Sequence, residues 1–275
     1  MSQYNFVKNC GAPLPALRKS IDLLLKLTDY PVALEVADEY VRRAPTTANA
    51  YYLRGVALQG VGDYNRAVTD YANAIELYGA DKSKISNSVF ARMAVSYTKL
   101  GRYCEATTPI LTWVAIDPLR RDNDRSRKII DDYERQGNCA ASIENRKERY
   151  ALRGGNRVVV ARCEINGVKG VFIIDTGASY VSIKKAFADR AKVPYANGGP
   201  VTLHTANGPA KGKLAKADAV TLGHLNARDV PVVVQDVDQR SYGQGVDGLL
   251  GMSFLSRFEV QLAGGFLEIR TRRRK

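Results

Sequence analysis

The chain has 275 residues, of which 45% are apolar and 25% are charged, an ordinary composition for a globular protein and a length that suits two domains. No apolar run is long enough to cross a bilayer. The net charge is +13, with 22 basic and 18 acidic residues in 1–150 and 19 basic and 10 acidic residues in 151–275. No basic stretch is interleaved with aromatic residues, which argues against a nucleic-acid partner.

The first ten residues, "MSQYNFVKNC", lack the apolar core of a signal peptide, so the protein is either cytoplasmic or exported by a signal removed from this sequence. Four cysteines (Cys10, Cys104, Cys139 and Cys163) form no C-x-x-C pair, and with only two histidines the sequence predicts no metal site. The even count permits two disulfides in one of three pairings, or four reduced thiols. Because Cys10 and Cys139 lie in loop-like stretches, we favour a periplasmic or otherwise exported protein, with a cytoplasmic one as the alternative.

Three segments of the N-terminal half look alike: "DYPVA" at 29–33, "DYNRA" at 63–67 and "RYCEA" at 102–106. Their tyrosines, Tyr30, Tyr64 and Tyr103, lie 34 and 39 residues apart. A period near 34 is typical of the tetratricopeptide repeat, a helix–turn–helix unit that this half resembles. Small residues in this repeat let paired helices approach closely, and aromatic residues fill the space beside them. Further positions that fit are Tyr51, Gly55, Leu58, Ala67, Tyr71 and Ala74 in the second unit and Phe90, Ala94, Tyr97, Ala106 and Pro118 in the third.

The third unit is preceded by a lengthened loop, "GADKSKIS", and followed by a polar segment, "DNDRSRKIIDDYERQG", that predicts a capping helix. We therefore expect an all-α tetratricopeptide-like domain of about three repeats over residues 1–139. The resemblance implies a concave surface that binds a protein or peptide partner. The alternative is a helical stack that only braces or dimerises the second domain.

The C-terminal part changes to period-two alternation and short apolar runs between Gly, Asn and Asp turns, which predicts β-strands. "EINGVKG" places Asn-Gly between two such runs and predicts a hairpin. Short helices are expected at "KKAFADRA" and "MSFLSRF". We predict a linker over 140–154 and an all-β domain over 155–275. The strand-like segments are "RVVVARCEI", "VKGVFIID", "YVSI", "AVTLG", "VPVVVQD", "FEVQL" and "FLEIR".

Within the β domain, the stretch "VFIIDTGASYVSI" at 171–183 runs from a strand into an Asp-Thr-Gly turn and leaves by a second strand. Downstream, "DGLLGM" at 247–252 precedes one of the short helices, and the turn-rich "LHTANGPAKGKL" at 203–214 lies between the two. In these three features, about the last 120 residues resemble the bacterial retropepsin-like aspartic proteases. The resemblance implies the all-β acid-protease fold of that family.

The same resemblance implies a role for each residue that matches the family's motifs. The catalytic acid would be Asp175, and the turn and the Leu-Leu-Gly element would support its loop through Thr176, Gly177, Leu249, Leu250 and Gly251. The hairpin would act as a flap over bound peptide, although an ordinary exposed β-turn is the alternative. Viral members tend to have acids where this chain has Ser179 and Tyr180, so we expect a different anchoring of substrate. Residues expected to border the substrate are Ala178, Ser179, Tyr180, Thr205, Ala206, Asn207 and Gly208.

Peptide hydrolysis needs an activated water and a proton donor, which two carboxyl groups about 3 Å apart supply by sharing one proton. This chain has one Asp-Thr-Gly, since Asp247 in "VDGLLG" lacks a Thr and Gly placed in the same way. We therefore expect a homodimer in which Asp175 of each subunit meets the other at a two-fold axis. Such a pair implies activity that peaks near or below neutral pH and falls on both sides.

The sequence thus predicts an aspartic endopeptidase that acts as a homodimer, with the repeat domain recruiting a protein substrate or partner. The alternative is a non-catalytic protein-binding adaptor with a vestigial protease fold. A serine hydrolase is not indicated, because the only histidines are His204 and His224 and the sequence has no G-x-S-x-G nucleophile turn. The sequence contains no G-x-x-x-x-G-K phosphate-binding loop, which argues against a nucleotide-dependent enzyme, and no cofactor is expected.

Overall fold

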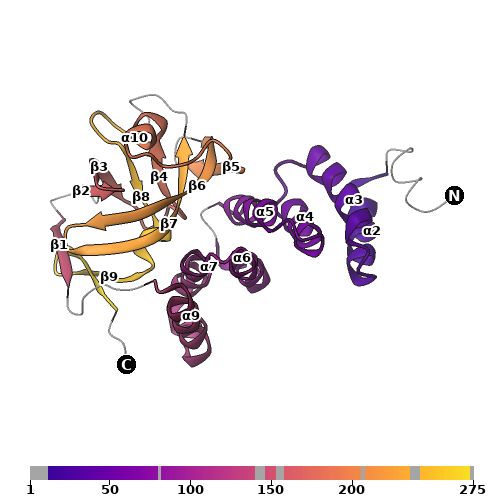
Figure 1. Cartoon of the computed structure of the whole chain (residues 1–275), viewed down its shortest axis with the longest axis horizontal. Helices are drawn as coiled ribbons and strands as arrows, with labels where there is room; N and C mark the ends of the chain where they lie inside the picture. Colours follow the sequence, from indigo (N-terminus) through magenta and orange to yellow (C-terminus); the bar gives the residue numbers. More distant parts are fainter. Residues whose placement is uncertain are drawn as a thin grey trace.

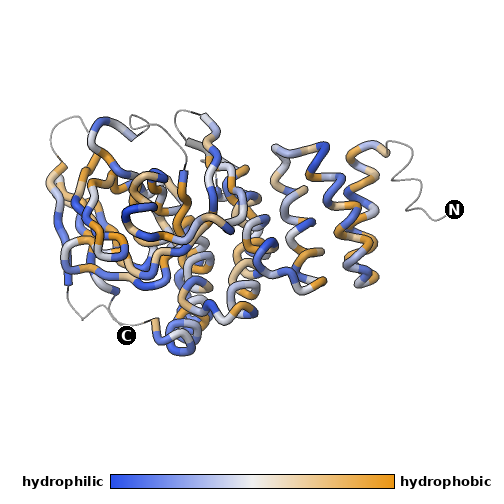
Figure 2. Tube along the Cα trace, turned by 45° about the horizontal axis from the view of Figure 1, so that its top comes forward, coloured by the Kyte–Doolittle hydropathy of each residue, from blue (hydrophilic) through white to orange (hydrophobic). Residues whose placement is uncertain are grey.

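The computed structural model describes residues 12–79, 82–139, 146–152, 158–205, 208–235 and 242–272. Its N-terminal part is a row of helices and its C-terminal part is rich in β-strands, which confirms the predicted fold class (Figure 1). In Figure 2 the tube alternates between hydrophobic and hydrophilic stretches, as expected for elements with one buried and one exposed side. Within the described ranges, no helix has both the length and the hydropathy needed to cross a membrane.

The helices pair in sequence as antiparallel hairpins, and the last long helix packs on the one before it. The four-residue α8 and a short 3₁₀ turn, η1, lie in the connections. The helices that follow the Asp-Tyr motifs begin at the tyrosine because the aspartate before it acts as N-cap; Asp63 accepts a hydrogen bond from the backbone N–H of Arg66 at 3.1 Å. The bounds are α2 Leu14–Lys26, α3 Tyr30–Arg43, α4 Ala48–Gly60, α5 Tyr64–Glu76, η1 Lys82–Lys84, α6 Asn87–Lys99, α7 Tyr103–Ile116, α8 Pro118–Arg121 and α9 Asp124–Gly137.

The spacing of small and aromatic residues in the repeats has a direct steric reason. A Cβ atom added to Gly55 would lie 2.8 Å from the ring of Tyr71, so only glycine allows α4 and α5 to approach this closely. The rings of Tyr71 and Tyr97 are fully buried. The polar segment after Pro118 forms the predicted capping helix as α9.

The C-terminal part forms a seven-stranded and a three-stranded sheet, with two short helices. The order in the larger sheet is β2-β3-β8-β4-β7-β6-β5, and the smaller one has the order β1-β10-β9. The strands are β1 Lys147–Ala151, β2 Val159–Ile165, β3 Val168–Ile174, β4 Val181–Lys184, β5 Pro200–Thr205, β6 Gly208–Leu222, β7 Leu225–Gln235, β8 Gly248–Leu250, β9 Phe258–Ala263 and β10 Phe266–Thr271, and the helices are α10 Lys185–Arg190 and α11 Met252–Leu255.

Two details of this domain bear on the sequence predictions. The hairpin between β2 and β3 turns at Asn166 and Gly167, which both have positive φ, as the Asn-Gly signal predicts. Strand β1 lies inside the segment predicted as a linker and pairs antiparallel with β10 along Lys147–Ala151. Regular structure of the β domain therefore begins earlier in the chain than its hydrophobic pattern indicates.

The larger sheet closes on itself, and part of it is buried on both faces. Strand β2 pairs with β3 and, at Glu164 and Ile165, also with β6, so six strands form a barrel. On β7 the side chains of Val232 and Val234 point into the barrel core, while Val233 points outward and is also fully buried. A strand buried on both sides needs a second layer against its outer face.

That second layer is the helical domain (Figure 1). Helix α5 lies against β5, and α7 lies against β7 and α11. Outward-facing side chains of three adjacent strands, together with Tyr180, join one apolar cluster with residues of α4 to α7 and α9. The members from the β domain are Tyr180, at the entry to β4, with Val201, Leu203, Leu214 and Val233. The helices and the barrel thus share a continuous core.

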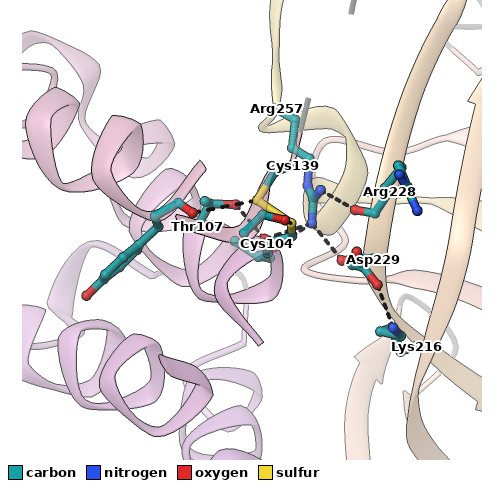
Figure 3. The surroundings of a disulfide bond; sticks show 10 residues. Cys104, Thr107, Cys139, Lys216, Arg228, Asp229 and Arg257 are labelled. Atoms are coloured by element: carbon teal, nitrogen blue, oxygen red, sulfur yellow. Dashed lines mark hydrogen bonds and ion pairs between the residues drawn. A yellow bond between two sulfur atoms is a disulfide. The ribbon is translucent and has the colours of Figure 1, made fainter. Parts of the chain in front are cut away.

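A partly buried arginine, Arg257, and a disulfide lie at the edge of this shared core (Figure 3). The guanidinium of Arg257 donates to the backbone carbonyl oxygens of Asp229 at 2.9 Å and of Cys104 at 3.2 Å. Burial lowers the pKa of Arg257 to about 10. Cys104 forms a disulfide with Cys139, which ties the start of α7 to the chain just after α9. This is one of the pairings that the sequence left open; Cys163 is a buried free thiol, and Cys10 lies outside the described residues.

Reduction of the Cys104–Cys139 disulfide should destabilise the protein. The bond closes a segment with a sequence separation of 35, and loops of this size contribute about 2–4 kcal/mol to the free energy of unfolding. We expect a reductant to lower the urea midpoint of the wild type, and the Cys104→Ser/Cys139→Ser variant to show the lowered midpoint with and without reductant. Equal midpoints for oxidised and reduced wild type would contradict the assignment.

Candidate active site

The candidate site is built on the end of β3. Phe172 and Ile174 are buried in the barrel, so period-two alternation places Ile173 and Asp175 on the opposite face, where both are half-buried. The carboxylate Oδ1 of Asp175 accepts a hydrogen bond from the backbone N–H of Gly177 at 2.8 Å. Thr176 and Gly177 are exposed. The acid is therefore accessible, and its carboxylate is oriented by its own loop.

Strand β8 holds this loop from the other side. It lies between β3, to which it is parallel, and β4, to which it is antiparallel, so the loop from β3 to β4 must pass across it. The backbone N–H of Asp175 donates to the carbonyl oxygen of Leu250 at 3.1 Å. Leu250 is fully buried, while Leu249 is only partly buried. The Leu-Leu-Gly element thus contacts the loop through the carbonyl oxygen of Leu250.

Helix α11 completes the attachment of the loop. The backbone N–H groups of Met252 and Ser253 donate to the carbonyl oxygens of Ala178 and Ser179 at 2.8 and 2.9 Å. The hydroxyl of Ser253 accepts from the N–H of Val181 at 2.9 Å. The three peptide groups that follow Ala178, Ser179 and Tyr180 are thus each hydrogen-bonded to α11: the first two through their carbonyl oxygens, and the third through the N–H of Val181. Ser253 was not among the predicted site residues, because a serine in a short helix carries no distinguishing signal.

The second candidate acid, Asp247, is occupied by structural contacts. Its Oδ2 accepts from the backbone N–H of Val171 at 2.9 Å, and its Oδ1 forms an ion pair with Arg190 at 3.2 Å. Its backbone carbonyl also accepts from the N–H of Lys184 at 3.0 Å. Asp247 therefore joins the middle of β3 to the chain just before β8 and does not serve as a twin of Asp175. Across the part of the chain that the structure describes, no group of three His, Cys, Asp or Glu residues is arranged to hold a metal ion.

Two of the residues expected to border substrate are covered by the helical domain. Ser179 is buried and contacts Lys82 Nζ from η1. Tyr180 is only 4% exposed, and burial raises the pKa of its phenol well above the usual value. Ala178, one residue closer to the acid, is half-buried. In this structure the first residues after the turn therefore line the interface between the domains.

The hairpin predicted as a flap is formed by β5 and β6. Thr205 and Gly208 are register partners at its end, and Gly208 has a φ of 104°, which favours glycine. Ala206 and Asn207 lie outside the described residues. The substrate-contacting role of all four residues stays a prediction.

An apolar row runs across three strands on the face that carries Asp175. Val160 on β2 is the register partner of Ile173 on β3, which is in turn the register partner of Leu249 on β8. Val160 is 51% exposed, and the other two side chains are partly exposed. Ile173 and Leu249 therefore flank the acid with apolar surface. Ile173 and Val160 were not predicted as site residues. Their strands have apolar residues on both faces, so the sequence does not indicate which face is exposed.

Parts of this chain are similar to one family model and to solved structures of two kinds. Residues 161–254 match a family model described as aspartyl protease. A retropepsin-like aspartic protease from Rickettsia conorii is similar at 26% identity, covering 45% of this chain and 98% of its own, with a TM-score of 0.34. The Arabidopsis OM64 TPR domain is similar at 16% identity, covering 44% of this chain and 94% of its own, with a TM-score of 0.38. The TPR2B domain of yeast Sti1 is similar at 22% identity, covering 46% and 95%, with a TM-score of 0.38.

No curated protein matches the whole sequence or a part of it. The family match and the observed elements agree with the resemblance stated from the sequence. Residues 161–254, within the C-terminal β domain, are similar to the aspartyl protease family, and the N-terminal helices have the paired arrangement that the tetratricopeptide-like spacing predicts.

Gly251 should be sensitive to the addition of a single methyl group. A Cβ at this position would lie 2.6 Å from the carbonyl carbon of Tyr180 and 2.8 Å from the carbonyl oxygen of Ala178, and both atoms belong to the backbone that α11 holds. We expect Gly251→Ala to lower the free energy of unfolding by about 3 kcal/mol, measured by urea denaturation.

Gly264→Ala is the matched control for this prediction. Gly264 has open space around its Cα and a φ of 57°, so the control should lose only the backbone strain of about 1 kcal/mol. Equal losses for the two variants would show that the loop can yield to the methyl group.

Proposed function

We propose that the chain is an aspartic endopeptidase that acts as a homodimer, with one Asp175 from each subunit in a shared site. The observation that carries this proposal is the loop that begins at Asp175. Its carboxylate is half-exposed and accepts the N–H of Gly177, and its backbone is held by Leu250 and by α11. A loop fixed by its neighbours in this way is what a pair of carboxyl groups in close contact requires.

The chemistry follows from a proton shared between two Asp175 side chains. The ionised carboxylate takes a proton from water while the water oxygen bonds to the peptide carbonyl carbon. The electron pair of the C=O bond moves to its oxygen, giving a tetrahedral intermediate. When the C–N bond breaks, a carboxyl proton passes to the leaving nitrogen, and an acid and an amine are released. Ile173 and Leu249 would form the apolar walls beside the reacting peptide, and the β5–β6 hairpin would cover it.

The row of Val160, Ile173 and Leu249 supports dimerisation. Exposed apolar surface of this kind beside an acid that needs a symmetry-related partner is typical of an interaction site. We infer that Val160, at the end of this row farthest from Leu249, contributes to the dimer interface, and that the exposed Thr176 braces the opposite loop. Dimerisation would then be a condition of activity.

The helical domain has a second surface that is free for a partner. Its contacts with the barrel involve α5 and α7, and a shallow cavity of about 310 Å³ opens between α4 and α6. We infer that this side recruits a protein substrate or partner. The residues that line the cavity are Gln59, Tyr64, Ala91, Arg92, Val95 and Lys99.

The alternative function is a protein-binding adaptor with a vestigial protease fold. One observation favours it: Ser179 and Tyr180, which the resemblance places beside substrate, are buried against the helices. Both hypotheses allow binding through the helical domain, and only the first requires peptide turnover. Cleavage of a diverse peptide mixture between acidic and neutral pH therefore separates them.

Asp175→Asn should abolish peptide cleavage without loss of fold. The amide cannot take a proton from water, so we expect kcat/KM to fall by at least about 10³-fold. Circular dichroism and sedimentation should match the wild type. Asp218→Asn is the control, since Asp218 is a 77% exposed carboxylate on β6 and should retain full activity. Cleavage that persists in Asp175→Asn would exclude Asp175 as the catalytic acid.

Val160→Lys should weaken the dimer. A lysine would place an unpaired charge on the apolar row, and its desolvation opposes association. We expect the dimer dissociation constant, measured by analytical ultracentrifugation, to rise at least about tenfold, with a parallel loss of activity at low protein concentration. Leu262→Lys is the control because Leu262 is 73% exposed on β9, in the smaller sheet. An unchanged constant for Val160→Lys would place the dimer interface elsewhere.

A further inference from the structure

One side chain of the helical domain, Asn73 of α5, makes two hydrogen bonds to the backbone of β5. Its Nδ2 donates to the backbone carbonyl oxygen of Pro200 at 2.9 Å, and its Oδ1 accepts from the backbone N–H of Thr202 at 3.0 Å. The same Nδ2 donates to the carbonyl oxygen of Thr69 within α5 at 3.1 Å. Asn73 is only 5% exposed, so these groups are shielded from water.

This contact satisfies the edge of the sheet. Strand β5 is the last strand in the sheet order and presents carbonyl and N–H groups of alternate residues on its outer side. A helix cannot continue the ladder with its own backbone, but a side-chain amide carries the same donor and acceptor as a peptide group. Asn73 therefore takes the place of one residue of a neighbouring strand.

The approach of α5 to this edge depends on a glycine. A Cβ on Gly199, just before β5, would lie 2.5 Å from Cγ2 and 2.7 Å from Cβ of Thr69. Thr69 lies one turn before Asn73 on α5. Gly199 thus lets the helix come close enough for the Asn73 amide to reach the strand.

The same helical surface also holds the exit of the catalytic loop. Tyr180, five residues after Asp175, belongs to the apolar cluster that includes Val201 and Leu203 of β5. Lys82 contacts the neighbouring Ser179 and lies 3.8 Å from the carboxylate of Glu76, at the end of α5. In the sheet, β7 and β6 separate β4 from β5. The helices therefore bridge two parts of the β domain that do not pair with each other, the loop exit and the base of the hairpin.

We propose that Asn73 is a positioning residue for peptide hydrolysis: from the helical domain it sets the place of the β5–β6 hairpin relative to Asp175. This inference rests on the proposed endopeptidase function. The loop of Asp175 is held separately, by Leu250 and α11, so loss of the Asn73 contact should move the hairpin and leave the acid in place. The effect should therefore fall on substrate binding more than on the chemical step.

The experiment compares Asn73→Ala and Asn73→Asp with Asn65→Ala in the full-length protein. Asn65 is an exposed asparagine two turns earlier on the same helix, so it controls for the loss of an amide from α5. In Asn73→Asp, one carboxylate oxygen can still accept from Thr202, while the other faces the carbonyl oxygen of Pro200 without a donor. With a peptide that the wild type cleaves, we expect KM to rise about tenfold in both Asn73 variants and kcat to stay within about twofold. Asn65→Ala should match the wild type.

A second measurement does not depend on activity. Amide hydrogen exchange in residues 201–205 should accelerate in both Asn73 variants and should be unchanged in Asn65→Ala. In Asn73→Ala the Thr202 N–H loses its acceptor, and in Asn73→Asp repulsion between the carboxylate and the Pro200 carbonyl oxygen should push β5 away from α5. Gly199→Ala perturbs the same contact from the strand side and should reproduce both the faster exchange and the higher KM. If an Asn73 variant fails to fold, the Gly199→Ala variant still tests the inference.

The outcomes separate this inference from the proposed function. A wild type that cleaves no peptide overturns both. A wild type that cleaves, together with Asn73 variants of unchanged KM, overturns only the positioning role. A fall in kcat with unchanged KM also overturns it, because that pattern indicates a smaller fraction of folded enzyme. A raised KM with faster exchange in residues 201–205 supports it.

Discussion

The structure depends on a sheet that is buried on both faces over the part that the helices cover. From β4 to β5 the strands bury one set of side chains in the barrel and a second set, including Leu214 and Val233, under the helices. The β domain without its helices would expose a contiguous apolar patch together with the unpaired edge of β5, which is a surface prone to aggregation. The repeats are therefore part of the core of the β domain, whatever else they bind.

Polar groups at the boundary make this packing specific. Apolar surfaces can slide over one another at little cost, whereas a buried charge without acceptors costs several kcal/mol. Arg257 reaches the Cys104 and Asp229 carbonyl oxygens only in one arrangement of the domains, and Asn73 reaches β5 only in that same arrangement. Arg257 follows α11, the helix that holds the loop of Asp175, and Cys104 lies in the first turn of α7, so the boundary and the candidate site share a support. We infer that these contacts fix the register of the helices on the sheet.

The sequence was informative where the physics is local. Repeat spacing, period-two alternation and the turn signals predict the helices, most strands and the loop of Asp175, because each depends on neighbours in the chain. Strand β1 was not predicted, because "KERYA" is polar and half-exposed and forms a strand only through its pairing with β10. Contacts between distant segments could not be predicted either. In the sequence, Asn73 does not differ from other helical asparagines, and nothing around Tyr180 indicates whether its side chain contacts substrate or a helix. The pairing of Cys104 with Cys139 likewise requires the spatial proximity of α7 and α9.

The register of the sheet places the candidate acid at the border between covered and open surface. Leu249 of β8 is the register partner of Ile173 on one side and of Ser182 on the other, and Ser182 is the partner of Val233. These residues lie on one face of the sheet. That face is exposed on the side of β2, and the helices cover it on the side of β5. The uncovered half is where the proposed partner subunit would bind, so the helices do not compete with dimerisation. A peptide lying across Asp175 would have apolar surface on one side and the wall of the helical domain on the other. Domain packing would then limit the length of the groove, a restriction that an isolated protease domain of the same sequence would not have.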